Sequence, residues 1–277
     1  MTRLRLGALL ALAVAISVFS HAPEAMAAAE VHRLNLVISV IPSELRGGGI
    51  NDLVERYNEY PLRARGLEAI KSIGMGWFFD TELRYFVRPN FALAAGVGHM
   101  KTISKREYLP ALGATIDLTA EVITVPIHVG AQYYLAPYTQ GDFQARAFVG
   151  GGLLSLTASR ALFSSFEVGL PAREDTLSDA SLGGQNRLVG TGDSPGYYVE
   201  MGAHMFFAAR YSIVVGAIYR SAIIRNLANE GGVIVPEDRA VPPFLMMPLL
   251  GRDGRPARIG DVDLSGVGVR MAVAIGF

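Results

Sequence analysis

Large apolar residues alternate with small or charged residues through the last part of the chain. From Val267 to Phe277 the odd positions hold valine, methionine, isoleucine or phenylalanine, and the even positions hold glycine, alanine or Arg270. A period of two is typical of a β-strand, because successive side chains point to opposite faces. The face that carries all the large apolar side chains must leave water. A tilted strand of this length covers roughly 25 Å, the height of the lipid-facing band of a membrane β-barrel.

The same alternation recurs in seven earlier segments. We expect strands at residues 32–41, 73–87, 91–103, 116–135, 143–157, 196–209 and 211–224, with Pro42 ending the first. The connections near Pro89, Tyr138 and Arg210 are short and three of the others are long, an asymmetry typical of bacterial barrels with periplasmic turns. The pattern predicts an all-β fold, a transmembrane eight-stranded antiparallel up-and-down barrel with long external loops.

The long connections differ in character. The first contains NDLVERYNEY, in which Asn51 is a candidate cap for a short helix with Leu53, Val54 and Tyr57 on one side. We expect this amphipathic helix outside the barrel wall. Residues 158–195 and 225–260 read as external loops. The apolar run VPPFLMMPLL at 241–250 either packs against the barrel mouth or forms a hydrophobic gate.

The N-terminus predicts export. Arg3 and Arg5 precede an apolar run from Gly7 to Phe19, and Ala25-Met26-Ala27 supplies small residues for cleavage. This run is shorter than the ~20 residues that a helical span needs. We therefore expect a signal peptide at residues 1–27, a barrel domain at 28–277 and location in the outer membrane of a Gram-negative cell.

Composition narrows the class further. The chain is 51% hydrophobic, 18% charged and near neutral, so no nucleic-acid partner is expected. A soluble barrel of the lipocalin type would hide its apolar residues inside, the reverse of the strands at 196–209 and 267–277. There is no cysteine, and no histidine has a partner at metal-ligand spacing, so we expect no disulfide, metal site or cofactor.

Polar and charged residues occupy the inward-facing positions. An eight-stranded barrel is just wide enough for side chains to fill, and buried charges are tolerable only when paired. We therefore predict a packed interior polar network of Asp80, Glu82, Arg84, His128, Arg146, Glu200, His204, Arg220 and Arg270. The functional alternatives are a narrow polar conduit or an acid–base site built on Glu200 and His204. No His-x-Ser pairing occurs, which argues against catalysis of the acyl-transferring kind.

Three segments resemble a known family. FFDTELRYFVRPNFALAAGVG, VPIHVGAQYYL and GVGVRMAVAIGF resemble the small eight-stranded outer-membrane barrels of the OmpA, OmpX and OmpW type, across essentially all of the mature sequence. The long first connection departs from OmpX-like members. The resemblance implies that Met271, Val273, Ile275 and Phe277 form the signal read by the barrel assembly machinery.

These observations predict the role of the protein. We expect a non-enzymatic monomer in contact with outer-membrane lipids, with a structural or surface-interaction role. The alternative, which the OmpW resemblance implies, is a narrow passive channel for small hydrophobic molecules.

Overall fold

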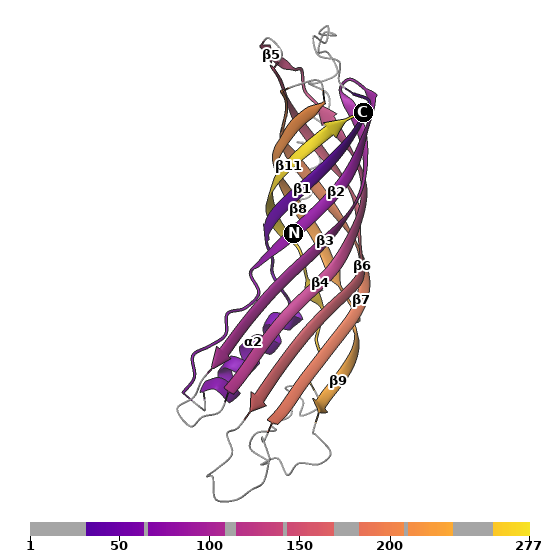
Figure 1. Cartoon of the computed structure of the whole chain (residues 1–277). Helices are drawn as coiled ribbons and strands as arrows, with labels where there is room; N and C mark the ends of the chain where they lie inside the picture. The colour runs from indigo at the N-terminus through magenta and orange to yellow at the C-terminus, as the bar shows by residue number, and fades with distance from the viewer. Residues whose placement is uncertain are drawn as a thin grey trace, which may run out of the picture.

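Eight antiparallel strands form a closed ring (Figure 1). The computed structural model describes residues 32–63, 66–108, 115–140, 143–168, 183–207, 210–234 and 257–277. In ring order the strands are β1 (Leu34–Glu44), β2 (Met75–Arg88), β3 (Phe91–Tyr108), β4 (Thr115–Tyr134), β6 (Phe143–Val168), β7 (Gly183–Phe206), β8 (Tyr211–Ile224) and β11 (Gly266–Gly276). The ring closes where β11 pairs with β1, Asn35 opposite Gly276 and Val40 opposite Met271. The predicted eight-stranded up-and-down barrel is confirmed.

The two faces of the wall have the predicted orientation. On β11, Val269 and Val273 are each 52% exposed on the outer face, whereas Arg270 and Ala272 between them are buried. The same division runs around the ring, with Ile38, Leu83, Val129, Val199 and Val215 among the exposed apolar side chains. An apolar belt therefore surrounds a partly polar interior, which is the reverse of a lipocalin-type barrel.

Four neighbouring strands are long, and three of them, β3, β6 and β7, are longer than predicted, whereas β4 has its predicted 20 residues. β3, β4, β6 and β7 project beyond the ends of the other four at one end of the barrel (Figure 1). β6 alone has 26 residues, against the roughly 9–11 that cross a membrane. The loop expected at 158–195 is wrong, because β6 and β7 pair from Ser159 opposite Gly192 to Val168 opposite Gly183.

The third long connection also contains strands. β9 (Ala228–Ile234) adds to the projecting part of β7, and β10 (Val262–Asp263) pairs with β8. At the opposite end the connections are short, and β5 (Tyr138–Gln140) pairs with the start of β6. The signal-peptide prediction for residues 1–27 and the apolar run at 241–250 lie outside the described residues.

Pro42 does not end the first strand. The ladder between β1 and β2 runs through Pro42 to Glu44, whereas the ladder to β11 skips Ile41 and Pro42 between Val40 and Ser43. Proline has no N–H to donate, so it fits where one of the two ladders is interrupted.

The predicted helix exists, but its position outside the wall is wrong. α2 (Gly49–Tyr57) continues into a π-helical turn, η2 (Asn58–Leu62). Its apolar residues Leu53 and Val54 are buried in the same cluster as Leu118 and Phe163, which face inward from the projecting strands. Tyr57 contacts Phe163, with ring centroids 5.7 Å apart. The helix packs inside the mouth because the inner face of these strands is itself apolar.

Asn51 anchors α2 rather than capping it. Gly48 stands at the N-cap with a φ of 58°, in the left-handed region that favours glycine. The Asn51 amide bonds both to the N–H and to the carbonyl of Ile73, each at 2.8 Å. No helix among the described residues is long and apolar enough to cross a membrane.

Candidate functional site in the barrel lumen

Arg270 is the centre of a buried ion-pair cluster in the middle of the barrel. Its Nη1 lies 2.7 Å from Glu200 Oε2, and its Nη2 lies 3.1 Å from Asp80 Oδ2 and 3.3 Å from Glu82 Oε2. Its Nε donates to Ser39 Oγ at 3.0 Å. The single guanidinium of β11 therefore ties together β1, β2 and β7 across the lumen.

Arg84 forms the second cationic centre. Its Nε is ion-paired with Glu82, its Nη2 lies 3.7 Å from Glu200 Oε1, and its Nη1 donates to the Tyr134 hydroxyl at 2.9 Å. Gln132 donates to Glu200 Oε1 at 2.9 Å. All of these side chains are buried, so their charges are compensated by one another rather than by water.

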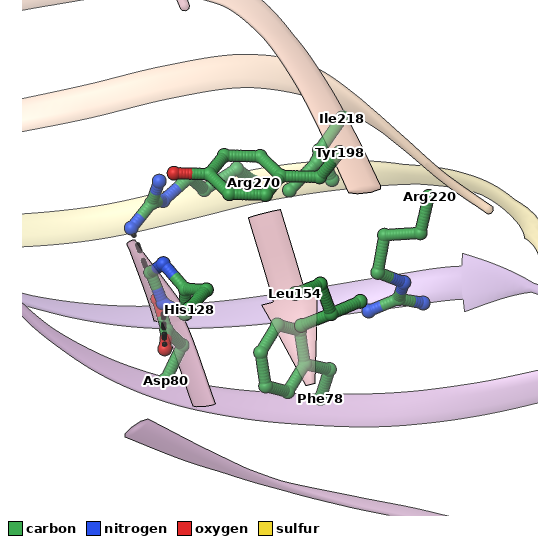
Figure 2. A pocket seen from close by; sticks show the side chains of 8 residues that line it. All are labelled: Phe78, Asp80, His128, Leu154, Tyr198, Ile218, Arg220 and Arg270. Atoms are coloured by element: carbon green, nitrogen blue, oxygen red, sulfur yellow. Dashed lines mark hydrogen bonds and ion pairs between the residues drawn. The ribbon is translucent and has the colours of Figure 1, made fainter. Parts of the chain in front are cut away.

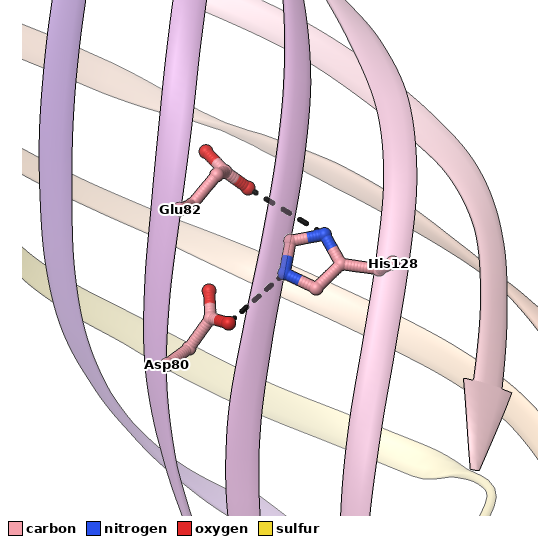
Figure 3. A group of neighbouring side chains, drawn as sticks. All are labelled: Asp80, Glu82 and His128. Carbon is pink, nitrogen blue, oxygen red and sulfur yellow. Dashed lines mark hydrogen bonds and ion pairs between the residues drawn. The ribbon is translucent and has the colours of Figure 1, made fainter. Parts of the chain in front are cut away.

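His128 reaches both carboxylates of β2 (Figure 3). Its Nε2 lies 2.9 Å from Asp80 Oδ1, and its Nδ1 lies 3.8 Å from Glu82 Oε2. β3 lies between β4 and β2, and the imidazole spans it at Gly96, which is the cross-strand partner of both Glu82 and His128. A Cβ at Gly96 would stand 2.5 Å from His128 Nε2, so only glycine leaves room for this contact.

Asp80, Glu82 and His128 also have the arrangement of metal ligands. One ligand atom from each lies within 4.8 Å of the others. The same two carboxylates, however, are ion-paired with Arg270 and, for Glu82, with Arg84. A divalent cation here would lie beside two guanidinium groups. The donor set therefore fits an ion-pair cluster better than a metal centre.

A polar chain leads from this cluster toward the short-turn end. Arg84 donates to the Tyr134 hydroxyl, which lies 3.3 Å from His204 Nδ1, and His204 Nε2 lies 2.7 Å from Ser212 Oγ. The Tyr134 hydroxyl accepts from Arg84, and its remaining bond to His204 Nδ1 can run in either direction, as can the bond between His204 Nε2 and Ser212. His204 is thus held at both ring nitrogens, and Phe206 stacks on it with ring centroids 4.1 Å apart.

The remaining predicted residues lie apart from the cluster. Arg146 donates to Gln144 Oε1 at 2.9 Å and to the Pro89 carbonyl at 2.6 Å, close to the short-turn end. Arg220 is buried, but neither Nη atom has a hydrogen-bond partner among the described residues. Glu200 and His204 bond to different partners, so they do not form the acid–base pair considered from their spacing.

The nine residues of the predicted interior network thus divide into three groups. Asp80, Glu82, Arg84, His128, Glu200 and Arg270 are in one ion-pair cluster, His204 is linked to it through Tyr134, and Arg146 and Arg220 are separate. Sequence reasoning missed the contributions of Ser39, Tyr134 and Ser212. The alternation along each strand places these three residues on the inner face. It does not give the strand register that brings them to these partners.

On the α2 side of the cluster, the lining of the lumen changes from polar to mostly apolar. A cavity of about 10 Å³ borders Asp80, His128 and Arg270 on one side and Phe78, Leu154 and Arg220 on the other (Figure 2). This volume holds about one water molecule. Beyond it, toward α2, most inward side chains are apolar, including Met100, Leu118 and Leu156.

The proposed assembly-signal residues lie on the outer face of β11 and at its end. Met271, Val273 and Phe277 are exposed and Ile275 is partly exposed, all on the face that carries the apolar belt. Their role as the signal read by the barrel assembly machinery stays a prediction.

No protein-family model and no curated protein sequence matches the chain. Among solved structures, the chain is similar to the outer membrane protein OprG from Pseudomonas aeruginosa, with 11% identity, a TM-score of 0.43 and coverage of 90% of this chain and 98% of OprG.

Two further barrels match in the same way. The N-terminal β-barrel domain of OprF from Pseudomonas aeruginosa matches with 11% identity and a TM-score of 0.32, covering 90% of this chain and 100% of that one. Ail, the attachment invasion locus protein of Yersinia pestis, matches with 10% identity and a TM-score of 0.28, covering 89% and 98%. At these scores the matches carry no functional conclusion for this chain.

Proposed function

We propose that the protein is a non-enzymatic integral barrel of the outer membrane that holds a rigid sheet above the cell surface as an interaction scaffold. Outer-membrane lipids surround the apolar belt, and the barrel assembly machinery inserts the chain. The short turns face the periplasm, as in other bacterial barrels, so the projecting strands face outward.

The observation that carries this proposal is the projecting part of β3, β4, β6 and β7. A barrel that only spans the membrane has no need for strands of 18 to 26 residues. Here the extra length has its own apolar core, in which α2 packs against Leu118, Leu156 and Phe163. Segment 66–71 also covers the edge of β3, where Ser104 Oγ donates to the Lys71 carbonyl.

Fractionation and conductance measurements test the proposal together. The expressed protein is expected in the outer-membrane fraction, with a gel mobility that shifts on heating. The purified barrel in planar bilayers is expected to show little or no conductance, because the ion-pair cluster fills the lumen. Recovery in the soluble periplasmic fraction would contradict the membrane assignment, and steady large conductance would contradict the sealed interior.

A narrow channel for small hydrophobic molecules is the second candidate, and one observation favours it. The outer half of the lumen is apolar and is filled by a helix, so displacing α2 would open an apolar vestibule. Leu53→Asp places a charge on the buried face of α2 and is expected to unseat it, because an unpaired buried carboxylate is strongly unfavourable. Glu55→Gln, on the exposed face, is the matched control.

Uptake of an apolar dye into vesicles distinguishes the two candidates. If the protein is a scaffold, the Leu53→Asp variant takes up dye no faster than wild type, although proteolysis within residues 46–74 becomes faster. If it is a helix-gated channel, dye uptake rises in Leu53→Asp and stays at the wild-type rate in Glu55→Gln.

A further inference from the structure

Arg220 is a buried cation that lies outside the ion-pair cluster of the lumen. Its side chain comes from β8, the residue is only 3% exposed, and neither Nη1 nor Nη2 has a hydrogen-bond partner among the described residues. Its guanidinium carbon lies 5.1 Å from the centroid of the Phe78 ring. A buried guanidinium without a counter-charge is strongly unfavourable, so this position calls for an anion.

The carboxylates of the lumen already have nearer cations than Arg220. The cluster contains three carboxylates, those of Asp80, Glu82 and Glu200, and two guanidinium groups, those of Arg84 and Arg270. His128 lies between two of these carboxylates, with its Nε2 2.9 Å from Asp80 Oδ1 and its Nδ1 3.8 Å from Glu82 Oε2. Among the described residues, none of the three carboxylates forms an ion pair with Arg220, so its guanidinium stands apart from the cluster.

The space beside Arg220 is small and enclosed. Leu154, Ile218 and Phe78 form apolar walls on its side of the 10 Å³ cavity, and Asp80 with His128 lies at the other end (Figure 2). Both oxygens of Asp80 are engaged, Oδ1 by His128 and Oδ2 by Arg270. Asp80 is therefore already paired with two other groups, and a cavity that fits about one water molecule admits only a very small ion.

We propose that Arg220 binds a single small monovalent anion, of the size of chloride, between its two Nη groups and the apolar end of this cavity. Two parallel N–H donors of one guanidinium suit such a ligand. The apolar walls exclude competing water and favour a weakly hydrated halide over a multivalent oxyanion. The ion supplies a counter-charge for Arg220 at the boundary between the ion-pair cluster and the apolar half.

Urea titration of the detergent-folded mature chain provides the first test. Chloride is varied against gluconate at constant ionic strength, with sulfate as a size control. Wild type is expected to gain stability with chloride and bromide but not with sulfate. Above the dissociation constant, each tenfold rise in chloride raises the folding equilibrium constant about tenfold.

Arg220→Met is expected to remove the chloride response, and in gluconate to be at least as stable as wild type, because an unpaired buried charge is gone. Arg146→Met is the matched control, since Arg146 is also buried but already donates to Gln144 and to the Pro89 carbonyl. This control is expected to keep the full chloride response. An unchanged wild-type midpoint in chloride, or a chloride response that survives in Arg220→Met, overturns the proposal.

Diffraction from wild-type crystals grown in bromide tests the location and does not depend on any variant folding. An anomalous peak within hydrogen-bond distance of the Arg220 guanidinium supports the site. Strong bromide peaks elsewhere with none at Arg220 overturn it.

Discussion

Replacing Arg270 should destabilise the barrel more than any other single arginine change in the lumen. Its guanidinium serves the carboxylates of Asp80, Glu82 and Glu200 at once, so Arg270→Met leaves at least one buried carboxylate without a cation. Removing one partner of a buried ion pair costs about 3–5 kcal/mol. We therefore expect the free energy of unfolding to fall by that amount.

The chain contains a convenient probe for this measurement. Trp77 is its single tryptophan, and it is 54% exposed on the outer face of β2. Its fluorescence should change when the barrel leaves lipid, so urea titration in vesicles reports unfolding without a label. Arg88→Met, an exposed arginine at the end of the same strand, is the control and should stay within about 0.5 kcal/mol of wild type.

A second substitution separates charge compensation from simple loss of packing. Glu200→Gln removes one of the carboxylates that Arg270 neutralises, so the double variant Arg270→Met/Glu200→Gln should be less destabilised than the sum of the two single variants. The expected coupling is about 0.5–3 kcal/mol. The reasoning is refuted if Arg270→Met unfolds within about 1 kcal/mol of wild type, or if the two substitutions are additive.

Two further predictions concern the wall and use the same titration. Gly96→Val should lower the free energy of unfolding by about 1–3 kcal/mol, because the new side chain would occupy the place of the His128 ring, whereas Gly74→Ala should be neutral because no atom lies within 4 Å of the added Cβ. Equal effects of the two would disprove the role given to Gly96. Val215→Arg in the apolar belt should cost about 2–4 kcal/mol, whereas Thr191→Arg on the projecting part of β7 should be tolerated. Similar costs at both positions would show that the belt is not where we place it.

The alternation of residues was sufficient to predict the barrel because lipid makes the two faces of a strand chemically different. Where the strands leave the belt, that contrast is lost. On β6 the inward residues are Leu154 and Leu156 before an irregularity, and Ala161 and Phe163 after it. Ala158, with a φ of 49°, lies at this bulge and shifts the alternation by one residue. A constant period of two therefore ended the strand too early.

The sequence predicted which residues lie inside the barrel, but not which of them contact one another. Parity along each strand places Asp80 and His128 inside, yet their contact depends on the register of three strands and on Gly96 between them. Likewise, amphipathicity gives α2 an apolar face without saying which surface covers it. The position of the helix depended on the projecting strands, which the pattern had not revealed.

Because the strands differ in length, the rim of the barrel is slanted at one end. β1, β2, β8 and β11 stop early, and the four long strands are consecutive in the ring, so the extra sheet rises from one side only. A molecule that descends onto the rim from above would meet α2 and the segments around it. A neighbour that moves sideways within the membrane plane would meet the outer surface of the sheet, with residues such as Arg160 and Thr191. The orientation of the protein about its own axis therefore decides which of its surfaces an approaching molecule encounters.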